Sequence, residues 1–446
     1  MLHRCRPWVD FDKFVEAVAL YDQSKDDAVN EFEQLFSRYQ GVPLSIATNQ
    51  GRSGIFFALK ILGIKKGDEV IVQSFTCRTA INPLLQIGAK VKLVDIDESF
   101  NMSVENVRKE ITDKTRAIIA THLFGLPCNV EELAEIAKDS GCYLIEDSCQ
   151  CLGASLNGKR TGSFGDIGIF SFNVDKPMPL GDGGMVTVNN EELIPEANRI
   201  RAMYKPVDLR DDLDCIYAIL IYNILTDKDI YDHFLSVSFA KDILVYNKKL
   251  RNIVNDDIAK KRDFPTFKKD ILASVTSSQG IKMKVIDRVR QIFYKQIEQV
   301  KGDHILMNAY RAIVGTAQLK TYDESVEIRN RNARRYQQIL GGSVSFETPN
   351  PGVLVKPAYF RYTVTSRSKC SVAEISRRAA KEGFEIGNYN WPQPIHLLFP
   401  YKNLIPHVGD KLKNSEYVSD HIIQLPIHNY VSYEEIQQIG NFLLDQ

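Results

Sequence analysis

The sequence predicts an α/β protein with a large domain on a mostly parallel sheet and a smaller α+β domain at its C-terminal end. Three observations support this fold class. From residue 42 to 190, short apolar runs alternate with segments whose apolar residues recur at helical spacing. From about residue 350, the pattern becomes one strand (YFRYTVTS) followed by helices. A chain of 446 residues also exceeds the size at which one hydrophobic core keeps growing.

The expected elements follow the chain in order. Two helices are expected in 11–40, where Phe32, Phe36 and Tyr39 fall on one face. Seven strands follow, separated by helical patterns such as SGIFFALKILG and NVEELAEIAKDSG. The candidate strands cover 42–48, 69–74, 91–96, 117–124, 143–147, 167–172 and 185–189.

We expect three parts: 1–205 with the N-terminal helices and the large domain, an insertion at 206–300, and 301–446 with a connecting helix and the small domain. The insertion contains the apolar run CIYAILIYNIL, which is too short for a membrane span of about 20 residues and predicts a buried helix. Residues 241–300 hold 14 Lys and Arg against 7 Asp and Glu. They are either a solvated helical excursion or a docking surface for an acidic partner, a nucleotide-linked substrate or an anionic membrane.

Composition and charge exclude some functions. The 56 basic and 56 acidic residues give zero net charge, so no nucleic-acid partner is expected. The first residues lack the apolar core of a signal peptide. The eight cysteines form no CxxC pair, which predicts reduced thiols in a cytoplasmic protein. Cys149 and Cys151 are poorly spaced for zinc, and no metal site is expected.

Four features at expected strand ends suit one cofactor, pyridoxal 5'-phosphate (PLP). Lys176 offers an amine for a Schiff base, and Asp147 offers an acid against the pyridinium nitrogen. Gly51, Arg52 and Ser53 open a helix whose free N–H groups favour a phosphate. Ser171 can donate a hydroxyl to the same phosphate.

Each feature alone has an ordinary explanation. A lysine before a proline is usually on the surface, Asp147 can cap a helix, the turn at Gly51 can be a plain connection, and Ser171 can be a core serine. The four together, in this order and spacing, favour the cofactor.

The motifs EDSCQ (146–150), SFNVDK (171–176), GDGG (181–184), HLFGLP and GTAQL resemble the DegT/DnrJ/EryC1/StrS family of sugar aminotransferases. The resemblance implies fold type I of the PLP-dependent transferases. It implies that Asp147 pairs with the pyridinium, that Gln150 reaches the phenolic oxygen of the cofactor and that Lys176 is the Schiff-base lysine. His396, in PIHLLFP, matches a position that faces the substrate; alternatively it is a structural hydrogen bonder.

Some positions depart from the family pattern. Cys77 stands where an aromatic residue usually covers the PLP ring, and Arg52 stands where a Thr is usual. The N-Y-R-M segment, whose Asn reaches the partner subunit's phosphate, aligns ambiguously, with His304 or Asn308 as candidates.

The resemblance implies a PLP-dependent aminotransferase that passes nitrogen from glutamate or glutamine to a keto sugar, expected to be nucleotide-linked, in amino-sugar or glycan biosynthesis. It also implies a homodimer. Two alternatives stay open. A PLP-dependent sugar dehydratase of the same superfamily is disfavoured by Lys176, because a histidine replaces this lysine in the dehydratases that resemble the family. A non-catalytic regulatory protein on this scaffold is the other.

Overall fold

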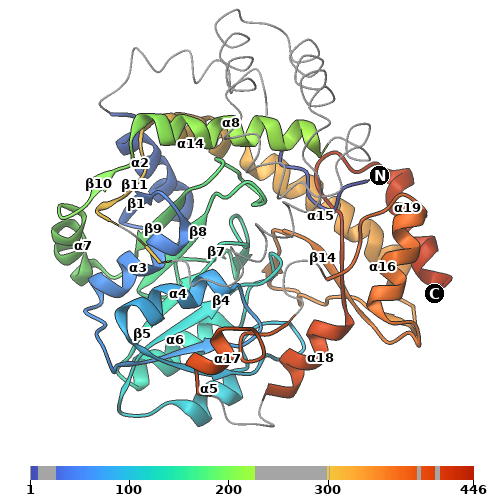
Figure 1. Ribbon diagram of the computed structural model, residues 1–446, viewed down its shortest axis with the longest axis horizontal. Helices are drawn as coiled ribbons and strands as arrows, with labels where there is room; N and C mark the ends of the chain where they lie inside the picture. Colours follow the sequence, from blue (N-terminus) through green and yellow to red (C-terminus); the bar gives the residue numbers. More distant parts are fainter. Residues whose placement is uncertain (1, 9–26, 227–298, 301, 389–392, 407–411) are drawn as a thin grey trace, which may run out of the picture.

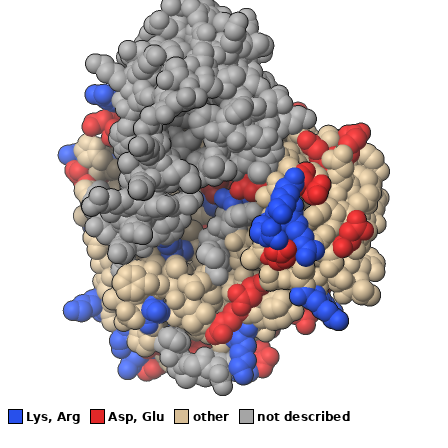
Figure 2. Space-filling model, turned by 45° about the vertical axis from the view of Figure 1, so that its right-hand side comes forward, with Lys and Arg blue, Asp and Glu red and all other residues tan. Residues whose placement is uncertain are grey.

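The computed structural model describes residues 2–8, 27–226, 299–300, 302–388, 393–406 and 412–446; all other residues are drawn in grey (Figure 1, Figure 2). The first of the two helices expected in 11–40 and most of the insertion at 206–300, with its basic section, lie outside these residues. The division of the chain at 205 and 300 therefore stays a prediction, as does the docking role of the insertion.

The large sheet contains all seven expected strands, each within three residues of its predicted bounds. They are β1 (Leu44–Thr48), β2 (Glu69–Gln73), β3 (Lys90–Val94), β4 (Thr115–Thr121), β5 (Tyr143–Asp147), β8 (Ile167–Ser171) and β9 (Gly184–Val188).

Two short strands that the prediction lacked, β10 (Lys205–Pro206) and β11 (His304–Leu306), extend the sheet to nine strands in the order β10-β11-β1-β9-β8-β5-β4-β2-β3. The prediction of seven strands was therefore wrong in number, because two or three residues are too few to show an alternating pattern.

The sheet is mostly parallel. Strands β3, β2, β4, β5 and β8 pair in parallel. Strand β9 runs antiparallel to both of its neighbours, β8 and β1. The carboxyl ends of β1, β4, β5 and β8 therefore meet at one edge of the sheet, where ligands of such folds bind.

Helices cover both faces of this sheet (Figure 1). One face packs against α3 (Gly51–Ile61), α4 (Arg78–Ile87) and α7 (Ile194–Arg201). The other face packs at one end against α2 (Ala28–Gln40), α8 (Leu209–Leu225) and α14 (Ala309–Leu319). At its other end lie α5 (Val104–Glu110) and α6 (Val130–Asp139). The sheet is thus buried on both sides, as its continuous apolar runs predict.

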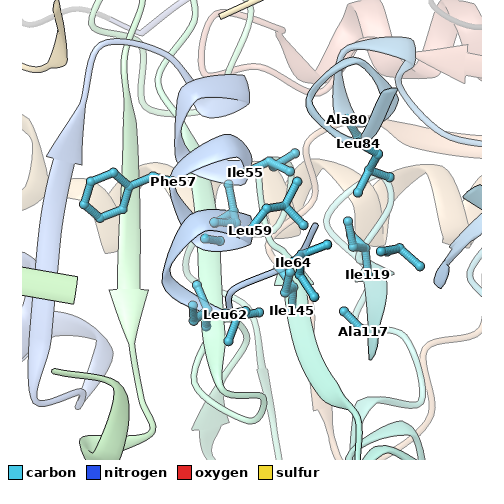
Figure 3. Close-up of a cluster of buried hydrophobic side chains, with 14 of the residues drawn as sticks. Ile55, Phe57, Leu59, Leu62, Ile64, Ala80, Leu84, Ala117, Ile119 and Ile145 are labelled. Carbon is cyan, nitrogen blue, oxygen red and sulfur yellow. The ribbon is translucent and has the colours of Figure 1, made fainter. Parts of the chain in front are cut away.

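Figure 3 shows the core between the sheet and α3 and α4. Ile55 and Leu59 of α3 meet Ile119 of β4 and Ile145 of β5, and all four are at most 3% exposed. Burying each such side chain contributes about 1.5–3 kcal/mol. Gly54 lets α3 approach the sheet, since a Cβ there would lie 3.2 Å from Val186. This close packing fixes the position of the first turn of α3.

The apolar run 215–225 lies in α8, and its described residues Ile216, Ile219 and Tyr222 are buried, as expected. In the described part of the chain, no helix combines the length and the apolar character that a membrane span requires.

The C-terminal part has the strand-and-helix pattern that the sequence predicts. Strands β12 (Phe346–Glu347), β14 (Tyr362–Ser366) and β15 (Ile422–Leu425) form a small antiparallel sheet. Its core is shared with α15 (Tyr322–Leu340), α16 (Val372–Lys381) and α19 (Tyr433–Leu444). The other elements are the short helices α17 (Tyr401–Leu404) and α18 (Lys413–His421) and the 3₁₀ turn η2 (Glu191–Leu193). A small separate sheet consists of β6 (Ser155–Leu156), β7 (Lys159–Arg160) and β13 (Val355–Lys356).

The N-terminal residues 2–8 lie against this C-terminal part. The Leu2 N–H donates to the Gly383 carbonyl at 2.8 Å, and the Glu385 N–H donates to the Leu2 carbonyl at 3.1 Å. Arg4 forms an ion pair with Glu385 at 3.5 Å. The His3 Nε2 lies 3.3 Å from the same carboxylate, but burial and the nearby Arg4 hold the pKa of His3 well below its ordinary value, so this ring is neutral. The segment is held by backbone and charge contacts, and it reaches the vicinity of Lys176 through Cys5, whose thiol donates to the Asp175 carbonyl at 3.3 Å.

Candidate active site

Three expected site residues lie at the edge of the sheet where the strand ends meet. Asp147 is the last residue of β5, Ser171 is the last of β8, and Gly51 begins α3 shortly after the end of β1. The parallel register places Asp147 opposite Ile169, two residues before Ser171. The strand order thus brings together residues that are 120 positions apart in the sequence.

The first turn of α3 lies directly on Ser171. A Cβ added to Gly51 would lie 2.9 Å from the Ser171 Cβ and 3.4 Å from the Cys149 Sγ, so only glycine fits. Gln50 precedes the helix in an extended conformation and gives its N–H groups no side-chain cap. The Gln50 amide instead donates to Asp182 of the Gly-Asp-Gly-Gly turn at 2.9 Å. This turn offers uncapped helix N–H groups beside a serine hydroxyl, which suits a phosphate.

Lys176 lies close to the Asp147 carboxylate and to the Cys149 and Cys77 thiols. Burial alone would lower the pKa of Lys176, but the Asp175 carboxylate, with these neighbours, outweighs burial and holds the pKa above its ordinary value. Burial also raises the pKa of Cys149 well above its ordinary value, so that thiol is neutral at physiological pH. Asp175 and Asp147 therefore supply the field that keeps Lys176 protonated. The sequence predicts an amine made available as a nucleophile by its surroundings, whereas these carboxylates stabilise the ammonium form.

Side chains beneath the site fix the strand ends. Gln150, 4% exposed, accepts the Phe124 N–H through its Oε1 at 3.0 Å. Glu146 contacts His122 at 3.0 Å and accepts the N–H groups of Gly162 at 2.7 Å and Gly165 at 2.7 Å. The buried Glu146 carboxylate thereby ties β5 to the following loop and restricts the orientation of the adjacent Asp147.

Cys77 and Arg52 lie at the same site. The Cys77 thiol is 3.0 Å from the Thr79 hydroxyl at the start of α4, and it is only partly buried. Burial lowers the pKa of Arg52, and the nearby Asp182 opposes this effect. Since Cys77 also acts electrostatically on Arg52, the guanidinium lies among the site residues. Ser53, the third residue of this turn, is 1% exposed within α3.

His396 has a structural partner on each ring nitrogen. Its Nδ1 is 2.7 Å from the Ser74 hydroxyl, its Nε2 is 3.0 Å from Glu416, and the residue is 2% exposed. These contacts match the structural alternative named for this residue, and its role as a substrate contact stays a prediction.

The two candidates for the inter-subunit asparagine differ in their surroundings. Asn308 caps α14, accepting the Ala309 N–H at 2.7 Å and donating to the Val207 carbonyl at 2.6 Å. The His304 side chain is 46% exposed beside Asp303.

Arg311, close to the phosphate turn, was not predicted as a site residue from the sequence. Arg311, 1% exposed, donates to the Asn49 carbonyl at 2.9 Å and pairs with Asp212 of α8. Its signal was the order Asn308-Ala309-Tyr310-Arg311, which resembles the N-Y-R-M segment of the family. The segment 2–8 left no signal, because its contacts outside the segment are with residues 170 or more positions away.

A model of the DegT/DnrJ/EryC1/StrS aminotransferase family matches residues 13–208 and 268–444. The chain belongs to this family. The match confirms the resemblance seen in the motifs and omits residues 209–267, which fall within the expected insertion.

Curated relatives and solved structures agree with this family. The chain is 36% identical to a GDP-perosamine synthase of Vibrio cholerae over 179 residues, which are 40% of this chain and 49% of that protein. It is 41% identical to a UDP-N-acetyl-3-dehydro-alpha-D-glucosamine 3-aminotransferase of Acidithiobacillus ferrooxidans over 155 residues, 34% of this chain and 42% of that protein. The matched part therefore spans about half the length of these relatives or less.

Among solved structures, the fold is similar to PseC of Helicobacter pylori, an aminotransferase involved in the biosynthesis of pseudoaminic acid, with a TM-score of 0.73 at 18% identity. That similarity covers 100% of this chain and 98% of the other. It confirms fold type I for the chain.

Proposed function

We propose that the protein is a PLP-dependent aminotransferase that transfers an amino group from glutamate or glutamine to a nucleotide-linked keto sugar. The observation that carries the proposal is the meeting of Lys176 and Asp147 beside the glycine turn that lies on Ser171. Membership of the family and the printed names of the relatives, which act on GDP- and UDP-linked sugars, support the substrate class.

The residues present fit PLP. Asp147 would hold the pyridine nitrogen protonated, the start of α3 with Ser171 would bind the phosphate, and Gln150 would face the phenolic oxygen. The close approach of Gly51 to Ser171 is the observation that favours this fit, since it sets the uncapped N–H groups of α3 beside the serine hydroxyl. When bound, PLP supplies an electron sink for the carbon from which a proton is removed.

Lys176 then acts as an acid and a base. Its raised pKa means that the neutral amine is a minor form before the cofactor arrives, so attachment has to release a proton. During turnover its Nζ takes a proton from the donor Cα, and it returns a proton when the amino group passes to the sugar. The neighbouring Asp147 and Asp175 carboxylates stabilise the ammonium that forms.

The expected homodimer, with residues of both subunits at each site, belongs to the same proposal, as does a cytoplasmic location. A dimer would be measured by light scattering of the purified protein, and a monomer that still turns over would contradict the shared site.

The test starts with the chromophore. We expect purified protein with added PLP to be yellow and to retain the cofactor after borohydride reduction. Lys176→Ala is expected to lose the covalent label, whereas Lys205→Ala, a matched change of a lysine 65% exposed beside Asp303, keeps it. Protein that stays colourless with added PLP would overturn the proposal.

Substrates are tested next, with glutamate and a panel of nucleotide-linked keto sugars. Formation of 2-oxoglutarate together with an aminated sugar supports an aminotransferase. A deoxygenated sugar without nitrogen would instead indicate the dehydratase alternative.

A further inference from the structure

A cavity of about 20 Å³ opens beside Lys176 on the side of the small sheet. Its walls come from the N-terminal segment 2–8, the loop at Asp175–Pro177, helix α15 and the loop before α19. A cavity of this size holds a group of a few atoms, such as a carboxylate, and not a nucleoside diphosphate. The segment 2–8 thus forms one wall of a cavity that reaches the expected catalytic lysine.

The pocket is strongly cationic. It is lined by Arg4, Arg6, Lys176 and Arg329. Arg361 lies behind the wall, where its guanidinium is 4.5 Å above the ring of Phe360, a wall residue. Two carboxylates oppose them: Asp175 in the wall, and Glu385, which pairs with Arg4 at 3.5 Å.

With Lys176 attached to a cofactor, these described residues leave a surplus of two positive charges. The field is evident at His428, whose pKa is lowered to about 3 by burial and by the nearby His3, Arg6 and Arg361.

Several buried donors in these walls, or directly behind them, lack an acceptor among the described residues. Arg329 is 4% exposed; its two terminal nitrogens donate to the Ser325 and Tyr322 hydroxyls, but its Nε has no acceptor. Arg361 is 2% exposed, and its Nε is likewise unsatisfied. The Asn429 amide nitrogen, also in the pocket wall, is a third such donor. Leaving a buried donor unpaired costs about 1–3 kcal/mol, so the arrangement calls for a ligand rich in acceptors.

We propose that this pocket binds the side-chain carboxylate of the amino donor, with Arg329 and Arg361 as specificity-determining residues for a dicarboxylic amino acid. The inference rests on the proposed function, because it places the donor between this pocket and Lys176. Guanidinium groups match carboxylates in charge and geometry. A donor with two carboxylates balances the surplus charge, whereas glutamine or alanine, with one, leaves part of it uncompensated.

Binding is tested without turnover. Trp8 lines the pocket, and the chain has two tryptophans, so Trp391→Phe isolates the Trp8 emission. We expect glutarate, a dicarboxylate without an amino group, to change this emission in a saturable way, and a nucleoside diphosphate or inorganic phosphate not to displace it. Displacement of glutarate by the nucleoside diphosphate, or no response to glutarate, would overturn the proposal.

Variants then assign the residues. Arg329→Gln and Arg361→Gln are each expected to weaken glutarate binding roughly 10- to 100-fold, as the loss of a charge-assisted hydrogen bond implies. Arg335→Gln is the matched control, since Arg335 lies on the same helix but packs 4.9 Å from Tyr433. Arg329→Lys keeps the charge without the planar fork and is expected to lose less affinity; it serves if Arg329→Gln does not fold. Unchanged binding in the variants that fold would overturn the proposal.

Donor preference completes the test and separates the two proposals. In Arg329→Gln, the preference for glutamate over glutamine in kcat/KM is expected to fall, mainly through KM. If the protein forms no chromophore with PLP but binds glutarate in an arginine-dependent way, the proposed function fails and the carboxylate pocket stands. If sugar amination occurs and donor preference is the same in every variant, the pocket assignment alone fails.

Discussion

Substitution of Gly51 by alanine tests the phosphate turn directly. The new Cβ would lie 2.9 Å from the Ser171 Cβ and 3.2 Å from its hydroxyl oxygen, closer than such atoms approach. Ser171 cannot rotate away, because the Cβ is fixed by the backbone and Ser171 pairs with Gly184 in the sheet. The start of α3 must therefore move by a few tenths of an ångström.

The expected cost comes from two opposing effects. Overpacking costs about 1–3 kcal/mol, and replacing glycine within a helix recovers about 0.5–1 kcal/mol. We expect a net loss of roughly 1–2 kcal/mol, visible as a Tm lowered by a few degrees. The effect on PLP is larger, because displaced N–H groups lose charge-assisted hydrogen bonds of about 1.5–3 kcal/mol, or roughly 10- to 100-fold in affinity.

The assay is a PLP titration followed by visible absorbance, with thermal melting of the same samples. Gly342→Ala is the matched control, since a Cβ at Gly342 meets nothing within 4 Å. A second variant, Gly51→Ala with Ser171→Gly, removes the clash and is expected to recover part of the stability but not the PLP affinity. Unchanged PLP affinity in Gly51→Ala would refute the assignment of the phosphate to this turn.

Three further predictions concern the surroundings of the site. Burial opposes the protonation of His122, but Cys128 and, after it, the contact with Glu146 outweigh burial and raise the pKa of His122 to about 10 from its ordinary 6.5. The stabilisation from protonated His122 is therefore complete below pH 6.5 and lost as the pH rises toward 10. The Tm of the wild-type protein should fall more over this range than the Tm of His122→Gln, and parallel curves of Tm against pH would contradict this. Asp212→Asn leaves the buried Arg311 without its counter-charge and should cost about 3–5 kcal/mol in urea unfolding; a loss below 1 kcal/mol would argue against the pair. Cys77→Phe should slow PLP loss during dialysis by up to roughly tenfold, since an aromatic contact contributes about 0.5–1.5 kcal/mol; an unchanged rate would place residue 77 away from the ring.

The strands and the central site residues could be predicted because their signals are local. A buried parallel strand is a continuous apolar run, and the end of that run marks the sheet edge, which is why Asp147, Ser171 and the turn at Gly51 could be placed together. Family motifs then supplied the cofactor that such a constellation suits.

The remaining features depend on long-range contacts that no local pattern encodes. Strands β10 and β11 exist because residues 205–206 pair with 304–306, which in turn pair with β1 at Thr48. The roles of Arg311 and Arg329 follow from partners on distant elements, and an arginine in a helix is ordinarily a surface residue. The protonated state of Lys176 depends on how many carboxylates surround it, which only the folded structure determines.

The contacts of the N-terminal segment impose an order on biosynthesis. Arg4 bonds to Glu385, 381 residues later, so the wall of the lysine pocket cannot form until the small sheet has left the ribosome. At about 5–20 residues per second, roughly 20–75 s separate the synthesis of these two residues. The parallel sheet can fold around its own core during that interval, and the donor pocket is completed last.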